Sequence, residues 1–166
     1  MSTSNNKKYL AFVDGGCLKN GSHMAEAYGS YIVFDITELQ EIPHYTNIST
    51  ELSSCLEQIR FPIHHKSGRV TNNIAEAMSM FMLISSLYHL GYFKRGIITI
   101  CSDSLLIINQ LQGLYATKDS NLLTIHRQTY QIFRLITENL RTGQSLSDVL
   151  TLSKISGDDM KLVLGH

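Results

Sequence analysis

The chain has 166 residues, of which 43% are hydrophobic, and it carries 14 basic and 14 acidic side chains. Its length allows one substantial core and leaves no room for a second domain, and the balanced charge excludes a basic field spread over the whole molecule. The polar start lacks a signal peptide, and no run reaches the roughly 18 apolar residues of a membrane span. Its three cysteines form no CxxC pair. We expect a reduced, soluble, cytoplasmic protein with a flexible tail (1–8) and a single domain (9–166).

The first half of the chain predicts three strands. Tyr9–Val13 is an apolar run that Asp14-Gly15-Gly16 would stop, which indicates a buried strand ending in a loop. Asn20-Gly21 suits a tight turn, and Glu26–Asp35 would then return antiparallel. Ile59–Ile63 is consistent with a third strand, while the stretch before it has no assignable pattern.

The second half predicts helices and strands in alternation. Apolar residues recur at helical spacing from Asn73 until Gly91 closes the segment, and Ile97–Cys101 is a continuous β-branched run typical of a central strand. Two more helices are expected at Ser104–Gln112 and Ser120–Arg141, and a last strand at Val149–Ile155. The expected order, β-β-β-α-β-α-α-β, implies an α/β fold in which helices flank a mixed sheet.

Three carboxylates lie at the ends of expected elements: Asp14 in YLAFVDGG, Glu76 in TNNIAEAM and Asp103 in IITICSDS. Burial of an acid is unfavourable, so several acids gathered at strand ends indicate a bound cation or a reacting group. Each also has a purely structural interpretation. Asp14 suits a turn, Glu76 suits a capping box with Asn73, and Asp103 with Ser104 suits a helix cap. Independent caps need not converge, whereas one divalent-ion site requires convergence, so the set predicts a metal site.

Two basic clusters accompany these acids along the chain. His64, His65, Lys66 and Arg69 precede the TNN segment, and Lys94-Arg95 precede the Ile97 strand. Most such charges are solvated surface. Their position beside the acids in the sequence would also suit contacts with phosphate groups near a metal site.

FVDGG, TNNxAE and the SDS that ends an apolar strand, together with LQGLYATKDSNLL, resemble the ribonuclease H family from about Tyr9 to Ile155. The resemblance implies a ribonuclease H-like mixed five-stranded sheet flanked by helices, and hydrolysis of the RNA strand of RNA–DNA hybrids with two Mg²⁺ or Mn²⁺ ions. It makes Asp14, Glu76 and Asp103 the catalytic residues and metal ligands. The substrate-binding residues that it implies are Gly15, Gly16, Thr71, Asn72, Asn73 and Ser104.

The chain departs from that family in two places. It has no Trp and no long basic insertion between its middle helices, so modest affinity for hybrid is expected. The fourth acid of the family would fall just past His166, so the domain is expected to lack its final helix. Asp158 or Asp159 is the nearer candidate for a fourth ligand. Their alternative role is a polar turn that caps a short helix starting near Met160.

Two other functions stay open at this point. A non-catalytic module that binds hybrids would be favoured by a missing fourth acid. A related nuclease acting on DNA, such as a junction resolvase, would use the same sheet. The sequence gives no indication of an obligate protein partner.

Overall fold

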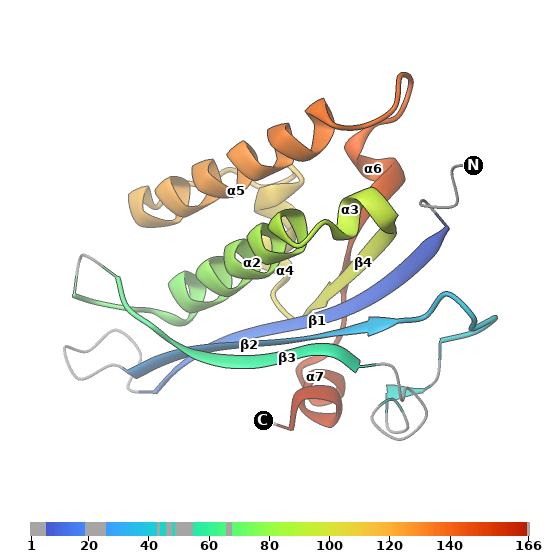
Figure 1. Cartoon of the computed structure of the whole chain (residues 1–166). Helices are drawn as coiled ribbons and strands as arrows, with labels where there is room; N and C mark the ends of the chain where they lie inside the picture. The colour runs from blue at the N-terminus through green and yellow to red at the C-terminus, as the bar shows by residue number, and fades with distance from the viewer. Residues whose placement is uncertain are drawn as a thin grey trace.

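We describe the protein from a computed structural model, which covers residues 6–18, 26–42, 44–45, 48, 55–65 and 68–165. Five strands form one sheet (Figure 1): β1 (Lys7–Leu18), β2 (Glu26–Asp35), β3 (Cys55–Ile63), β4 (Gly96–Ser102) and β5 (Leu150–Lys154). The helices are α2 (Asn72–His89), α3 (Tyr92–Arg95), α4 (Leu105–Leu111), α5 (Ser120–Glu138), α6 (Leu146–Val149) and α7 (Gly157–Leu164).

The sheet is mixed, and its strand order is β3-β2-β1-β4-β5. β1 pairs antiparallel with β2, and β2 pairs antiparallel with β3. β4 pairs parallel with both β1 and β5, because each of these connections crosses over through helices. The predicted mixed five-stranded sheet flanked by helices is therefore confirmed.

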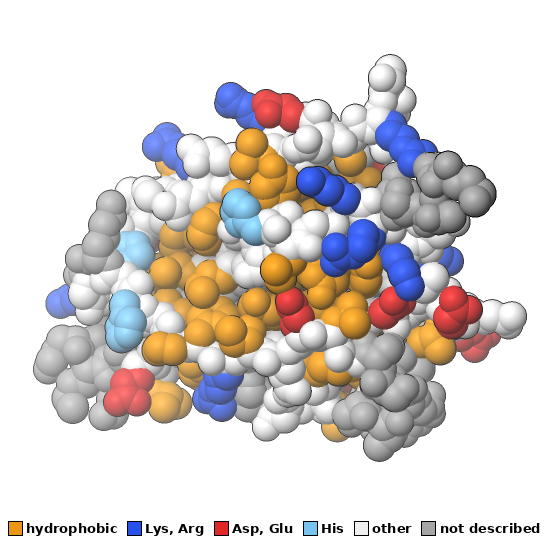
Figure 2. All heavy atoms as spheres, in the orientation of Figure 1, with side chains coloured by type: hydrophobic (Ala, Val, Ile, Leu, Met, Phe, Trp, Pro, Cys, Tyr) orange, Lys and Arg blue, Asp and Glu red, His pale blue; other side chains and the backbone are white. Residues whose placement is uncertain are grey.

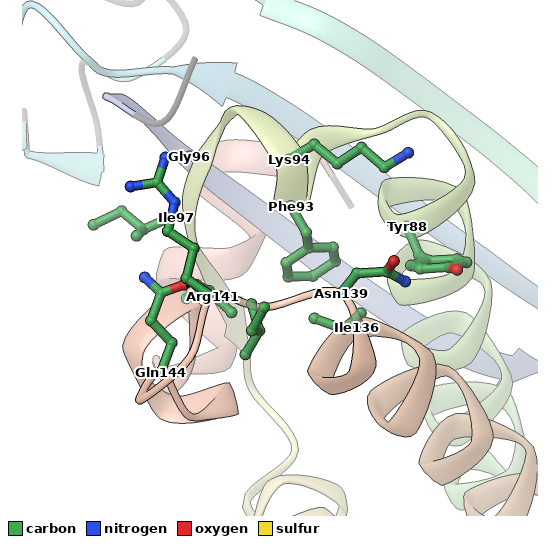
Figure 3. A pocket seen from close by; sticks show the side chains of 11 residues that line it. Tyr88, Phe93, Lys94, Gly96, Ile97, Ile136, Asn139, Arg141 and Gln144 are labelled. Carbon is green, nitrogen blue, oxygen red and sulfur yellow. Dashed lines mark hydrogen bonds between the residues drawn. The ribbon is translucent and has the colours of Figure 1, made fainter. Parts of the chain in front are cut away.

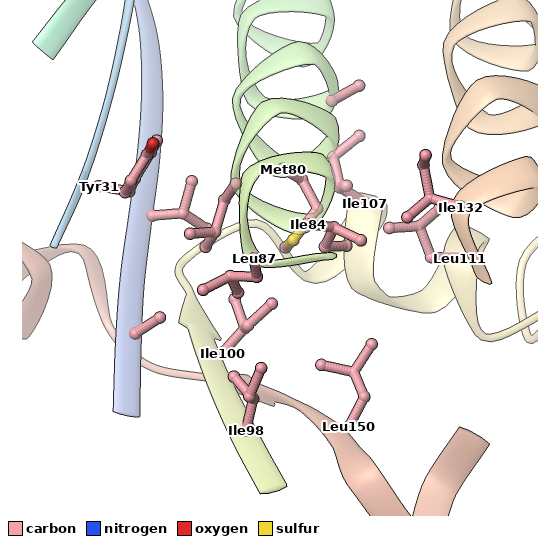
Figure 4. Close-up of a cluster of buried hydrophobic side chains, with 14 of the residues drawn as sticks. Tyr31, Met80, Ile84, Leu87, Ile98, Ile100, Ile107, Leu111, Ile132 and Leu150 are labelled. Carbon is pink, nitrogen blue, oxygen red and sulfur yellow. The ribbon is translucent and has the colours of Figure 1, made fainter. Parts of the chain in front are cut away.

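The sheet is covered on both faces, so the protein has two hydrophobic clusters. The larger one lies between the sheet and the helices α2, α4 and α5 (Figure 4), and includes Ile84, Ile100 and Ile107. Side chains of a strand alternate between faces. Leu10 and Phe12 therefore point to the opposite face, where they join the smaller cluster with residues of α7. α7 lies on the other side of the sheet from α2 and α5 (Figure 1).

β1 is longer than the sequence predicts at both ends. It begins at Lys7, so residues 7 and 8 belong to the sheet rather than to a tail. It also continues through Asp14 to Leu18, since Asp14 pairs with Ser30 and the ladder with β2 is not interrupted. The prediction that Asp14 ends a strand in a turn is wrong. The two glycines that suggested a turn lie within the strand, where Ala75 packs against Gly15 and Tyr28 packs against Gly16.

Other boundaries differ more modestly. β3 starts earlier than predicted, at Cys55, and the short helices α3 and α6 were not predicted, since four residues carry too little periodicity. Contrary to the expectation that the domain lacks its final helix, a helix of eight residues, α7, follows β5, and it starts at Gly157 rather than near Met160. The expected turn at Asn20-Gly21 lies outside the described residues.

All three cysteines are unpaired, and in the described part of the chain no helix is long and apolar enough to cross a membrane.

Candidate active site

Asp14 and Asp103 reach the same place from neighbouring parallel strands. Phe12 of β1 pairs with Cys101 of β4, and both belong to the smaller hydrophobic cluster on the α7 face. Asp14 lies two residues beyond Phe12, and Asp103 lies two residues beyond Cys101. Because side chains alternate along a strand and adjacent strands are about 4.8 Å apart, this register brings the two carboxylates side by side.

Glu76 comes from α2, whose first turn lies directly against β1 at Gly15. A Cβ atom added at Gly15 would lie 2.7 Å from the Glu76 backbone nitrogen and would overlap the Ala75 carbonyl group. Only glycine allows this approach. The Cys17 amide also donates a hydrogen bond to Asn72 Oδ1 (2.9 Å), which fixes the start of α2 to the same strand. The absence of a side chain at Gly15 therefore brings Glu76 to the sheet.

The capping interpretation of Glu76 is wrong. The helix cap is Thr71, whose hydroxyl accepts a hydrogen bond from the Ile74 amide at 3.2 Å. A capping-box partner would then stand at Ile74, and Glu76 lies beyond it in the helix. Thr71, predicted to contact substrate, is half-buried and has this structural role, while Asn73 is exposed at the start of α2.

The capping interpretation at the end of β4 holds for Ser104 and not for Asp103. Ser104 caps α4, because its hydroxyl accepts a hydrogen bond from the Ile107 amide at 3.4 Å. Asp103 precedes the cap. Among the described residues, its buried Oδ1 atom has no hydrogen-bond partner. A buried carboxylate oxygen without a donor is unfavourable unless a cation or a ligand meets it.

The three acids act on one another electrostatically. The pKa of Asp14 is raised to about 7, by burial first and then by the nearby charges of Asp103 and Glu76, while a backbone hydrogen bond from Gly15 and the charge of Lys161 act in the opposite direction. Burial also raises the pKa of Glu76, a hydrogen bond from Ser104 opposes this, and the charge of Asp103 adds to it. Full ionisation of the cluster is therefore unfavourable without a compensating positive charge.

The donor atoms fit a divalent cation in kind, since Mg²⁺ and Mn²⁺ prefer carboxylate oxygens. The partnerless Oδ1 atom of Asp103 supports this fit. As the side chains stand, however, the described residues contain no group of three His, Cys, Asp or Glu side chains close enough to hold a metal ion. Glu76, which comes from α2 rather than from the sheet, is the carboxylate whose pKa is lowered by the neighbouring Ser104 hydroxyl against the effect of burial.

Tyr28 lies near the acids and Arg60 stacks on it, and neither residue was found from the sequence. Ser30 pairs with Asp14 on one side and with Arg60 on the other, so Asp14 and Arg60 share one face of the sheet. The Arg60 guanidinium carbon lies 4.7 Å from the centre of the Tyr28 ring. Burial and the charge of Asp14 raise the pKa of Tyr28, while Arg60 lowers it. No local motif marks these two residues, because only the strand register places them here.

A groove of about 510 Å³ adjoins this row of side chains. Its lining includes Tyr28, Arg60 and His64, together with apolar residues of β2 and β3. Gly16 lies at the edge of this region, and a Cβ atom added there would lie 2.6 Å from the Tyr28 ring. The groove therefore combines an aromatic ring, a guanidinium group and an imidazole, and Tyr28 links it to the carboxylates through the effect of Asp14 on its pKa.

Asp158 and Asp159 lie in the first turn of α7, whose cap is Ser156. Acidic side chains are favoured at this end of a helix by its dipole. Asp158 is exposed, and Asp159 acts on Tyr45, whose pKa is raised by burial first and then by the charges of Cys101 and Asp159. The role of either acid as a fourth ligand stays a prediction.

The predicted phosphate contacts of Lys94 and Arg95 are not supported by their position. Arg95 lies 4.7 Å from the centre of the Tyr92 ring and donates to the Tyr9 hydroxyl at 3.2 Å. Both residues precede β4, whereas Asp103 follows its other end. Lys and Arg side chains gather near α3 on the face shown in Figure 2. A separate hollow of about 200 Å³ beside Lys94 lies between α3 and the end of α5 (Figure 3) and is no part of the acid site.

No protein-family model and no curated protein sequence matches the chain. Its fold does match solved structures. RNase H1 from the halophilic archaeon Halobacterium salinarum has a TM-score of 0.63 at 16% identity, with 93% of this chain and 89% of that chain covered. The N-terminal RNase H domain of a Mycobacterium tuberculosis protein has a TM-score of 0.62 at 19% identity, with 92% and 84% covered.

LC11-RNase H1, in a complex with an RNA/DNA hybrid, has a TM-score of 0.63 at 19% identity, with 90% of this chain and 86% of that chain covered. At such identities the likeness establishes the fold. The chain therefore has a ribonuclease H-like fold, and the resemblance that its motifs carry is confirmed at this level.

Proposed function

We propose that this protein is a metal-dependent endonuclease that hydrolyses the RNA strand of RNA–DNA hybrids. The observation that carries the proposal is the meeting of Asp14, Glu76 and Asp103 at one edge of the sheet, where burial and the charges of the other two acids raise the pKa of Asp14. The complex of LC11-RNase H1, a protein of similar fold, with an RNA/DNA hybrid supports the substrate class.

The three carboxylates would hold Mg²⁺ or Mn²⁺. A bound divalent cation supplies activation of the attacking water and stabilisation of the leaving oxygen. Ionised Asp14 is the form that binds the cation, so binding should increase as the pH rises through its raised pKa. The Ser104 hydroxyl, which lowers the pKa of Glu76, would orient that carboxylate.

The surrounding residues would bind the substrate. Arg60, stacked on Tyr28, presents a cation on the same face of the sheet as Asp14 and suits a backbone phosphate. Asn72 and Asn73 stand at the start of α2, where they would reach 2′-hydroxyl groups in the minor groove of the hybrid. Gly15, Gly16, Thr71 and Ser104 complete the surface proposed to face the RNA strand.

The proposal is tested with Asp14→Asn. We expect Mg²⁺-dependent cleavage of a labelled RNA–DNA hybrid to fall by about a hundredfold or more, because the variant loses a charged ligand at nearly constant volume. Glu138→Gln, an exposed change on α5, is the matched control and should leave cleavage unchanged. Equal cleavage by Asp14→Asn and the unmodified protein would exclude this site. Equal cleavage of duplex DNA and hybrid would instead favour a DNA nuclease.

A second function, hybrid binding without catalysis, is favoured by one observation. The described carboxylates do not stand close enough together to hold a metal ion, and a lysine of α7 acts on one of them. Binding of the hybrid with no cleavage at any concentration of Mg²⁺ or Mn²⁺ would support this function. It would contradict the endonuclease.

A further inference from the structure

Tyr28 extends from β2 across the sheet onto β1. The two strands pair Tyr28 with Gly16, and a Cβ atom added at Gly16 would lie 2.6 Å from Cζ and 2.8 Å from Cε1 of the Tyr28 ring and would overlap its hydroxyl oxygen. The hydroxyl end of the ring therefore fills the space in which any other residue at position 16 would place its side chain. Glycine at this position lets the Tyr28 hydroxyl lie over the neighbouring strand.

This placement brings the Tyr28 hydroxyl close to the acids. Gly16 follows Asp14 by two residues in β1, so the two positions face the same side of the sheet about 7 Å apart. The pKa of Tyr28 gives separate support, because burial and then the charge of Asp14 raise it, Arg60 lowers it and Asp103 raises it. A nucleic-acid strand held at the acids therefore has a neighbouring nucleotide within reach of this hydroxyl.

The Arg60 guanidinium helps to fix the ring in this position. Its central carbon lies 4.7 Å from the centre of the Tyr28 ring. Tyr28 is half-buried, whereas Arg60 is exposed. The guanidinium covers one face of the ring, and the other contact of the ring is made by its hydroxyl end at Gly16. The group that Tyr28 offers to a ligand at the acids is thus its hydroxyl, on a ring held by two contacts.

The charges around the hydroxyl select its partner. Because its pKa is raised, the phenol keeps its proton at neutral pH and can donate a hydrogen bond. A phosphate oxygen would bring another negative charge close to Asp14 and Asp103, whereas a ribose 2′-hydroxyl is neutral and accepts a hydrogen bond. The exposed Arg60 guanidinium is the group that suits a phosphate. The pair therefore matches a ribonucleotide, with the sugar at Tyr28 and a phosphate at Arg60.

We propose that Tyr28 is a specificity-determining residue, whose hydroxyl donates a hydrogen bond to the 2′-hydroxyl of the ribonucleotide next to the cut. This proposal deepens the endonuclease function and rests on it. A deoxyribonucleotide at this place would lack the acceptor for the Tyr28 hydroxyl, which lowers the preference for a DNA strand. The role also depends on Gly16, because a side chain there would displace the hydroxyl.

The contact is tested by combining Tyr28→Phe with hybrids that lack single 2′-hydroxyl groups. The RNA strand carries one deoxyribonucleotide, placed in turn at each position on either side of a defined cut, and kcat/KM is measured for each hybrid. We expect the unmodified protein to lose about three- to tenfold at one position next to the cut, because one hydrogen bond is lost there. Tyr28→Phe should cleave the all-RNA strand about three- to tenfold more slowly and show no further loss at that position.

A matched variant controls for the loss of a tyrosine hydroxyl elsewhere. Tyr88→Phe changes a residue at the other end of α2, beside the hollow that is no part of the acid site. It should show the full loss at the same position, like the unmodified protein. Tyr28→Phe keeps the ring that contacts Arg60, so its Tm should match that of the unmodified protein.

An equal loss at that position in Tyr28→Phe and in the unmodified protein would overturn the role of Tyr28 and leave the endonuclease intact. A loss reduced to the same extent at every position would also overturn it, because no single 2′-hydroxyl would then be involved. No cleavage of any hybrid by the unmodified protein would overturn the endonuclease and this proposal together.

Discussion

At the scale of single residues, the acid site extends across three strands. Asp14, Ser30 and Arg60 are successive partners in the ladders of β1, β2 and β3, and therefore share one face of the sheet. Tyr28 stands next to this row and supports the Arg60 guanidinium by a cation–π contact. An acid and a guanidinium on one row can serve different parts of a nucleic acid, the reacting phosphate and a neighbouring one.

Arg60→Ala tests this division of roles. We expect hybrid affinity to fall about three- to tenfold and the slope of log K against log salt to decrease by about 1, because one phosphate contact is lost. Cleavage at saturating substrate should change little. Fluorescence anisotropy at several salt concentrations provides the measurement. Arg134→Ala is the matched control, and an unchanged salt slope in Arg60→Ala would show that Arg60 contacts no phosphate.

At the scale of elements, the contact between α2 and β1 positions the one acid that does not come from the sheet. Thr71 caps the helix, Asn72 ties it to β1, and Gly15 lets its first turn approach the strand. Glu76 is therefore placed by packing of the backbone rather than by its own contacts. The geometry of the site depends on a position that carries no side chain.

Gly15→Ala should damage both stability and activity. The added methyl group would overlap the Ala75 carbonyl and push α2 away from β1, so we expect a loss of about 1–3 kcal/mol in the free energy of unfolding and at least a tenfold loss of cleavage. Urea unfolding and the hybrid cleavage assay measure these effects. Gly157→Ala is the control for the stability measurement alone, since its Cβ would meet only Asp103 Oδ2 at an ordinary 3.4 Å. Normal stability of Gly15→Ala would contradict this account of the contact.

At the scale of the whole molecule, the acid cluster connects function to the free energy of folding. Burial raises the pKa of Asp14 from 3.8 to about 7, so the folded chain holds a proton that the unfolded chain has released at pH 5 to 6. The contribution of protonated Asp14 to the free energy of unfolding is fully present below about pH 4 and is lost as the pH rises through 7. The site thus destabilises the metal-free protein at neutral pH.

Asp14→Asn should remove this dependence. In EDTA, we expect the free energy of unfolding of the variant to rise by about 2 kcal/mol relative to that of the unmodified protein when the pH is changed from 4 to 8. This figure allows for the part of the carboxyl that stays solvated. Mg²⁺ at pH 8 should raise the Tm of the unmodified protein and leave that of the variant unchanged. Urea unfolding at both pH values measures the first effect. A difference that is the same at pH 4 and pH 8 would show that Asp14 titrates normally.

Much of the fold was predictable because its local patterns agree with its tertiary contacts. Glu26–Asp35 is a strand with the predicted bounds, and the helical spacing from Asn73 matches α2 closely. The end of β1 was not predictable from Asp14-Gly15-Gly16, since this tripeptide usually forms a turn. Here the ladder with β2 and the packing of α2 on Gly15 outweigh the local preference.

The sequence by itself determined the α/β class, the order of the main elements and the three acids in recognisable frames, because hydrophobic periodicity and short motifs are local properties of a chain. Only the tertiary structure decided which residues surround those acids. The strand register places Tyr28 and Arg60 on the same face of the sheet as Asp14, and the charge of Lys161 in α7 lowers the pKa of that carboxyl. These contacts join segments far apart in the chain, and the pKa values of the acids depend on burial, which a local sequence pattern does not predict.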